Sequence, residues 1–147
     1  MINGIFLISK RKHETSNKLL STFKKNTKIK KAGIFGILDP LATGILPIIV
    51  GEATKYIRFI KSTKKMYMVQ CKLGVYSDCG DYESQPISFQ NEKSIINSLT
   101  TSTVKHTFNK FLGPYMQLPP MFSASKYKGK PLYLYARNNI KVQREYK

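Results

Sequence analysis

The segment best suited to chemistry runs from Gly33 to Gly44 and carries a single acidic residue, Asp39. Asp39 precedes Pro40, and an aspartate in such a turn commonly satisfies nearby backbone amides. An aspartate carboxylate is also ionised at neutral pH, so it can serve as a nucleophile or a base toward a bound substrate. The spacing alone fits both a turn residue and a catalytic anion.

Positive charge dominates the sequence around this segment. The 147 residues include 25 Lys and Arg against 8 Asp and Glu, which gives a formal net charge of +17. Before residue 78 the only carboxylates belong to Glu14, Asp39 and Glu52. Such a charge excess attracts a polyanion, whereas any single lysine can equally belong to a solvated surface. No segment pairs a basic face with a long apolar stripe, so we expect RNA or DNA as the partner and no membrane.

Length and composition exclude several classes of protein. A chain of 147 residues has the usual size of one domain, so we expect a single domain over residues 1–147. The longest apolar run, residues 45–50, is far shorter than the roughly 20 residues that span a bilayer, and the start has no basic signal-peptide region. We therefore expect a cytoplasmic protein. Cys71 and Cys79 form no metal-type cluster, so we expect neither a disulfide nor a metal.

Periodicity predicts the elements that must position Asp39. Apolar runs at 5–8 and 45–50 are typical of buried strands, and Thr15 or Ser16 can cap a helix between them. Alternation over 67–74 predicts a half-buried strand. Further predictions are helical faces after residue 50 and over 91–99, a helix starting near Pro131, and core positions at Phe108, Phe111 and Leu112.

Short motifs follow one another along the chain: LDPLATG at 38–44, GEATK at 51–55, KMY at 65–67, SDCGD at 77–81 and QLPPMFSA at 117–124. In this order they resemble the signature of the TruB family of bacterial tRNA pseudouridine synthases. The resemblance implies an α/β (α+β) pseudouridine-synthase catalytic fold, with a mixed, largely antiparallel sheet flanked by helices and loops. It also implies an isomerase that converts the T-loop uridine of tRNA, at the TΨC position, to pseudouridine without a cofactor. Asp39 falls on the family's catalytic aspartate.

The resemblance also implies a set of substrate-binding residues. Tyr67 matches the tyrosine that stacks on the flipped base, although its spacing alone also fits a strand residue packed in a core. Lys10 and Lys65 match lysines that support the active site or a phosphate. Lys126 and Arg137 lie in a matched region and would contact the backbone of the T arm. Each of these lysines could instead be simply solvated.

Two substitutions depart from the family pattern. Ile34 stands where the family usually has a histidine that helps to engage the flipped loop, so an imidazole donor is lost. Arg11 follows Lys10 where the family has proline, which leaves that loop freer.

The sequence stops at Lys147, before the family's arginine that pairs with the catalytic aspartate and before its C-terminal PUA RNA-binding domain. We therefore expect a catalytic domain that is incomplete at its C-terminus. One hypothesis is an enzyme whose missing arginine comes from a second chain, from Arg137 or from Arg144. The alternative is a catalytically impaired remnant that binds RNA without turnover.

Overall fold

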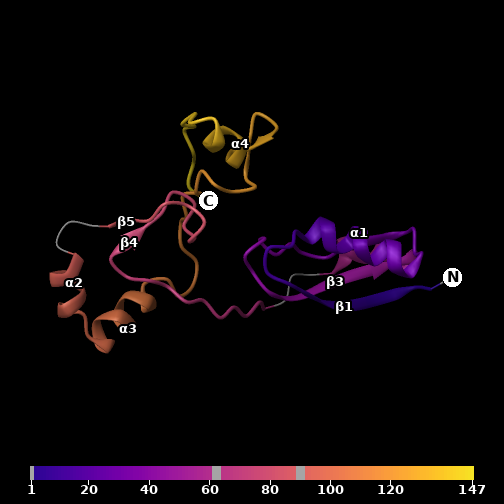
Figure 1. Ribbon diagram of the computed structural model, residues 1–147, viewed down its shortest axis with the longest axis horizontal. Helices are drawn as coiled ribbons and strands as arrows, with labels where there is room; N and C mark the ends of the chain where they lie inside the picture. The colour runs from indigo at the N-terminus through magenta and orange to yellow at the C-terminus, as the bar shows by residue number, and fades with distance from the viewer. Residues whose placement is uncertain (1, 61–63, 89–91) are drawn as a thin grey trace. The chain divides into compact units, whose positions relative to one another are not determined.

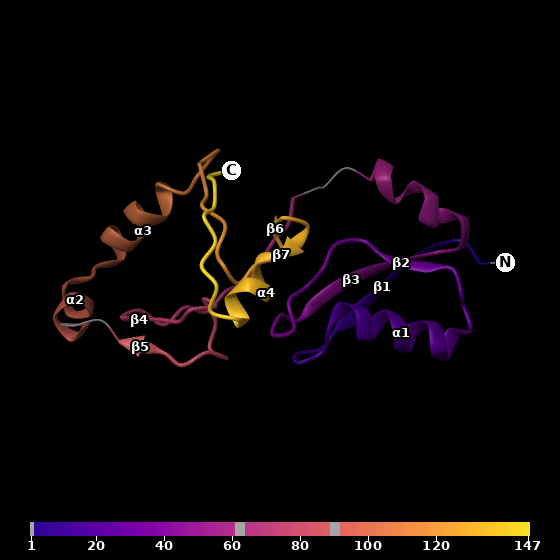
Figure 2. The same cartoon turned by 90° about the horizontal axis from the view of Figure 1, so that it is seen from above.

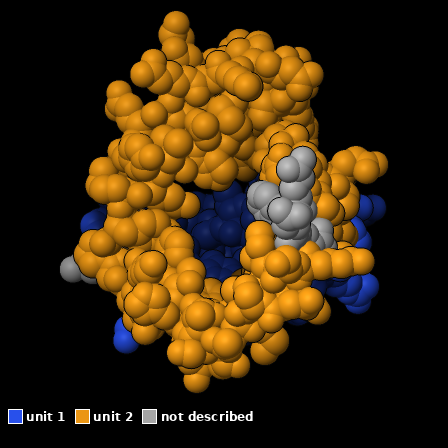
Figure 3. Space-filling model, turned by 90° about the vertical axis from the view of Figure 1, so that its left-hand side faces the viewer, with its two compact units in different colours: residues 1–67 blue, residues 68–147 orange. Residues whose placement is uncertain are grey.

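The computed structural model describes residues 2–60, 64–88 and 92–147. The chain divides into two compact units, Met1–Tyr67 and Met68–Lys147, coloured blue and orange in Figure 3. Helices and antiparallel strand pairs make it an α+β fold, which confirms the expected fold class. A single domain over residues 1–147 stays a prediction, and each unit is described here by itself.

Unit 1 is built on a three-stranded antiparallel sheet in the order β1-β3-β2, of which Figure 1 labels β1 and β3. Its strands are β1 (Gly4–Lys10), β2 (Ala32–Ile34) and β3 (Gly44–Val50). β1 and β3 pair over their full lengths, and β2 pairs with the end of β3. The strands predicted at 5–8 and 45–50 are therefore confirmed, and their register sets Lys10 opposite Gly44.

Helix α1 (Ser16–Thr27) covers one face of this sheet (Figure 2). The Thr15 hydroxyl accepts a hydrogen bond from the Lys18 backbone N–H at 3.1 Å, which identifies Thr15 as the N-cap. The Phe23 ring packs against the Phe6 ring with their centroids 5.2 Å apart. Burying each such side chain stabilises the fold by about 1.5–3 kcal/mol. The remaining members of this core are Ile8, Leu20, Ile29, Ala32, Ile48 and Val50.

Gly51 allows β3 to continue directly into a 3-10 helix, η1 (Gly51–Phe59). Its φ of +63° lies in the left-handed region, and a Cβ there would lie 2.4 Å from the Ile2 carbonyl oxygen. Any side chain would therefore disrupt this junction. The next residue, Glu52, donates its backbone N–H to Asn3 Oδ1 at 2.7 Å. The helix predicted after residue 50 is thus present in its tighter 3-10 form.

Glu52 gives unit 1 an expected acid sensitivity. Lys31 and Lys55 each place Nζ 2.5 Å from a Glu52 carboxylate oxygen, and the hydrogen bond from Lys31 does most to lower the pKa of Glu52 from 4.5 to about 2. Because the folded-state pKa is depressed, this contribution is present above pH 4.5 and is lost as the pH falls toward 2. Between pH 4.5 and 2 we expect the thermal midpoint of Glu52→Gln to fall slightly less than that of the unmodified chain, because the variant has no carboxylate to lose. The difference is small because both ion pairs of Glu52 are exposed. Equal pH slopes for the two proteins would contradict this.

Unit 2 contains short elements and few buried apolar side chains. Its hydrophobic residues below a tenth exposure, among those described, are Leu132 and Val142. The helix expected over 91–99 and the one expected near Pro131 are confirmed as α2 and α4. The elements are β4 (Val75–Tyr76), β5 (Ile87–Ser88), α2 (Glu92–Ser98), α3 (Thr101–Asn109), β6 (Lys126–Tyr127), β7 (Lys130–Pro131) and α4 (Leu132–Arg137).

Two predictions for residues 67–112 are wrong. The structure has no strand over 67–74, because that alternating segment has no partner strand and β4 begins only at Val75. The expected core positions Phe108, Phe111 and Leu112 are 68%, 58% and 75% exposed. Alternating or apolar side chains are buried only where another element packs against them. In the described ranges, no helix has both the length and the apolarity that a membrane span requires.

Candidate active site

The segment that carries Asp39 is the loop between β2 and β3, at one end of the unit 1 sheet. The Phe35 backbone N–H donates to the Pro47 carbonyl at 3.0 Å, so β3 holds the start of this loop. The Ala42 N–H donates to the Asp39 carbonyl at 3.0 Å and closes a turn around Pro40. The loop therefore has a defined backbone at the residue of interest.

Ser16, at the start of α1, fixes the residue before Asp39. Its hydroxyl donates to the Leu38 carbonyl at 3.0 Å and accepts from the Leu38 N–H at 3.1 Å. The Ser16 side chain is buried, so water does not compete for these hydrogen bonds. Together they satisfy both the N–H and the carbonyl of Leu38. The end of α1 that carries its N-cap thus anchors the loop from one side.

Lys10 anchors the loop from the other side. It is the last residue of β1, it is fully buried, and its Nζ donates to the carbonyls of Glu14 at 2.7 Å, Arg11 at 3.0 Å and Pro40 at 3.2 Å. The His13 N–H also donates to the Pro40 carbonyl, at 2.8 Å. A lysine ammonium has three N–H donors, so none remains for a phosphate. Of the two roles expected for Lys10, this geometry favours support of the active site.

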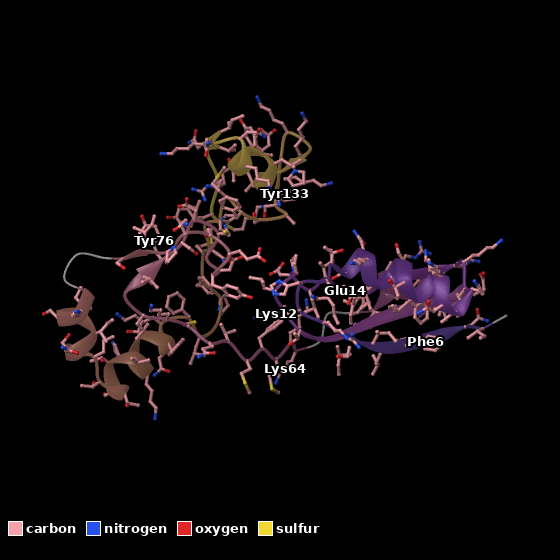
Figure 4. The ribbon with its side chains drawn as sticks, viewed as in Figure 1. Phe6, Lys12, Glu14, Lys64, Tyr76 and Tyr133 are labelled. Carbon is pink, nitrogen blue, oxygen red and sulfur yellow. The ribbon has the colours of Figure 1, made fainter. Side chains whose placement is uncertain are left out.

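Asp39 itself projects from this anchored loop. The residue is exposed, and its carboxylate has no hydrogen bond or ion pair within the part of the chain that the structure describes. Arg11 and Lys12 lie in the segment 11–14 that is tied to Pro40, and Figure 4 shows Lys12 and Glu14 at this end of unit 1. The site therefore presents the accessible carboxylate of Asp39, on a backbone held at several points.

Tyr67 and Lys65 lie near the end of unit 1 and are both exposed. The Tyr67 side chain is 62% exposed and has no ring or hydrogen-bond partner among the residues described. It is therefore not packed in a core, and its ring face is open to a base. No contact that places it beside Asp39 is present in the described structure.

Lys126 and Arg137 belong to a basic hairpin segment of unit 2, residues 123–137. Lys128 and Gly129 connect β6 to β7 with φ of +46° and +79°, as in a two-residue hairpin turn. The Arg137 guanidinium lies 5.4 Å from the Tyr133 ring centroid, and Lys128 Nζ lies 5.5 Å from the Tyr127 ring centroid. Figure 4 labels Tyr133 on this segment. Neither tyrosine was predicted as a site residue, although Lys126 and Lys128 on either side of Tyr127 were an available signal.

Arg144, one candidate for the missing arginine, is bonded elsewhere in unit 2. Its Nη1 donates to the Pro119 carbonyl at 2.8 Å, and its Nε is buried without a partner among the described residues. The structure thus joins Lys10 to the Asp39 loop by a hydrogen bond, and it places Lys126 and Arg137 on the same short segment of unit 2. No cluster of three or more potential metal ligands occurs within residues 2–60, 64–88 and 92–147.

The comparisons of this chain with known proteins agree with one another. The TruB family pseudouridylate synthase N-terminal domain matches residues 24–147. The tRNA pseudouridine synthase B of Mannheimia succiniciproducens is 45% identical over 144 residues, covering 98% of this chain and 46% of the relative. The proteins of the same name from Haemophilus influenzae and Hydrogenovibrio crunogenus are 43% and 42% identical, with 45% and 46% of their lengths covered. The chain thus spans about half the length of the curated relatives it matches.

Proposed function

This chain belongs to the TruB family of pseudouridylate synthases, and from that premise we propose that it isomerises the T-loop uridine of tRNA to pseudouridine. The observation that carries the proposal is the Asp39 loop. Lys10 and Ser16 hold its backbone from opposite sides, while the carboxylate of Asp39 stays exposed. A turn residue that only satisfied local amides would not leave its carboxylate without a partner.

The proposed reaction rearranges bonds within one nucleotide. The bond from C1′ to N1 breaks, the uracil turns in place, C1′ bonds to C5, and the proton on C5 leaves while N1 gains one. Atoms balance without a co-substrate. Asp39 supplies the anionic group at C1′, either by adding to the sugar or by stabilising and deprotonating it. Both routes need an ionised carboxylate that reaches the sugar of a flipped nucleotide.

Lys10 is a positioning residue in this proposal. Its ammonium bonds to the carbonyl of Pro40, which adjoins Asp39, and to two carbonyls of the preceding loop. A nucleophile or base is effective only when it is held close to its productive geometry. By satisfying three carbonyl groups at once, Lys10 reduces the freedom of the backbone that carries Asp39.

Binding of the flipped nucleotide falls to Tyr67 and Lys65. Extruding a base costs a few kcal/mol, and stacking on an aromatic ring recovers about 1–3 kcal/mol of that cost. The exposed ring of Tyr67 can supply this stacking. Lys65, two residues earlier and also exposed, can contact a phosphate of the loop.

The basic hairpin segment of unit 2 supports binding of the T arm. Lys126 and Arg137 are exposed cations, and Arg137 lies against the Tyr133 ring. Cations beside aromatic rings suit RNA, because phosphates and unstacked bases are recognised together. The parts of the relatives that this chain does not match leave room for a second polypeptide segment, in the same or another chain, that supplies the arginine partner of Asp39.

The test is pseudouridine formation by the chain on tRNA that carries tritium at uridine C5, with release of tritium to water as the readout. We expect release to rise with time in proportion to protein, because C5 loses its hydrogen in the proposed reaction. Retained tRNA binding with no release would contradict the proposal and favour the RNA-binding remnant. Retained release in a chain lacking the Asp39 carboxylate would contradict the assigned role of that residue.

A further inference from the structure

A group of lysines gathers at the end of unit 1 opposite the Asp39 loop. The α1-end lysine cluster consists of Lys24, Lys25, Lys28 and Lys30. Lys24 and Lys25 lie in the last turn of α1, Lys28 ends the helix, and Lys30 and Lys28 line the same hollow beside Gly51. Lys24 is half-buried and the other three are exposed.

In the part of the chain that the structure describes, no carboxylate forms an ion pair with this cluster. Glu52 is the acid at this end of the sheet, and both of its oxygens are taken by Lys31 and Lys55. None of the four cluster lysines forms an ion pair or hydrogen bond through its side chain with another described residue. Uncompensated lysines at one place repel each other, and a bound polyanion relieves that repulsion.

The cluster lies too far from Asp39 to contact the same nucleotide. β1 runs from Gly4, opposite Val50, to Lys10, opposite Gly44, and Lys10 bonds to the Asp39 loop. The Gly51 N–H bonds to the Lys31 carbonyl at the other end of the sheet. A strand rises about 3.4 Å per residue, so roughly 20 Å separate the two ends.

Lys28 is an unusual choice on structural grounds. It ends α1 with φ of +60°, in the left-handed region that favours glycine or asparagine at the end of a helix. A lysine side chain here gains no partner that would offset this conformation among the residues described. Helix termination therefore does not explain a cation at this position.

We propose that the α1-end lysine cluster is a second RNA-contact surface, which binds phosphates of the tRNA outside the loop that carries the target uridine. This inference rests on the proposed function, because it assumes that the Asp39 loop receives the T loop. The chemistry is that of phosphate neutralisation, so it adds affinity and orientation and reads no base. In this proposal a whole tRNA contacts both ends of unit 1, and a minimal T-loop hairpin is held at the Asp39 end alone.

The experiment compares tRNA binding with minimal-hairpin binding in the triple variant Lys25→Gln, Lys28→Gly and Lys30→Gln. We expect tRNA affinity near physiological salt to fall by at least about tenfold and the slope of log affinity against log salt to shrink by about 2–3. Hairpin affinity should change by less than about twofold, because the proposal assigns the cluster to phosphates outside the T loop. Because Lys28→Gly suits a left-handed position, the thermal midpoint of that single variant should stay unchanged or rise.

The matched control removes three exposed lysines of unit 2, two within α2 and α3 and one directly after α3, as Lys93→Gln, Lys105→Gln and Lys110→Gln. An equal loss of tRNA affinity in this control, or an equal loss for hairpin and tRNA in the cluster variant, would overturn the inference. Tritium release separates the two proposals. Absent release with cluster-dependent tRNA binding would refute the proposed reaction alone, whereas normal release with unchanged tRNA binding would refute the cluster alone.

Discussion

Replacing Asp39 with asparagine is expected to lower pseudouridine formation by at least about 10³-fold while tRNA affinity stays within about threefold. The amide has the shape of the carboxylate but carries no negative charge, so it can neither add to C1′ nor accept a proton from the sugar. Folding should be unaffected, because the Asp39 carboxylate has no partner among the described residues. The rate is measured by tritium release from C5 and the affinity by a direct binding assay.

Glu145→Gln is the matched control for Asp39→Asn. It removes one exposed negative charge from the same net-basic chain, so a general electrostatic effect on RNA binding would act in both variants. We expect the control to keep the rate of the unmodified chain. Equal losses of rate in the two variants, or loss of tRNA binding in Asp39→Asn, would show that Asp39 is not the reacting group.

Replacing Lys10 with methionine is expected to destabilise unit 1 by about 3–5 kcal/mol. Methionine fills a similar volume but donates no hydrogen bond, so the carbonyls of Arg11 and Glu14 lose this buried donor and that of Pro40 keeps only His13. A unit of this size has a total stability of roughly 3–10 kcal/mol, so the loss is large. The denaturant midpoint measures it, and faster hydrogen exchange of the His13 amide reports the loosened contact with Pro40.

Lys18→Met separates this effect from the loss of a positive charge. Lys18 lies on the exposed side of α1, and its side chain makes no contact comparable to that of Lys10. We expect its midpoint to match the unmodified chain, and its tRNA affinity to change little. If Lys10→Met kept both the midpoint and the slow exchange of His13, the positioning role of Lys10 would be wrong.

The elements of unit 1 were largely predictable from the sequence. Apolar runs fixed the places of β1 and β3, and the Thr15 hydroxyl marked the start of α1, because these signals act between residues close in sequence. The strand over 67–74 failed because an alternating segment needs a partner strand, which no local pattern supplies. The prediction that Phe108 and Phe111 are core residues was wrong for the same reason, because no other element of the described structure packs against them.

The role of Lys10 depended on contacts that only the fold creates. From the sequence, Lys10 was equally suited to a phosphate and to support of the active site. Its burial and its bond to Pro40, 30 residues away, favour support. Ser16, which holds Leu38 across 22 residues, was predicted only as a possible helix cap. Long-range hydrogen bonds of this kind leave no periodic or compositional signal.

The sequence by itself determined the family resemblance, the basic character and the choice of Asp39 as the candidate catalytic residue, because those depend on residue types and on spacing within short segments. Only the tertiary structure decided that Asp39 is exposed on an anchored loop, that Lys10 is a buried donor, and that unpaired lysines gather at the far end of α1. The physical reason is that burial and hydrogen-bond partners are properties of surfaces brought together by folding, and residues distant in the chain form those surfaces.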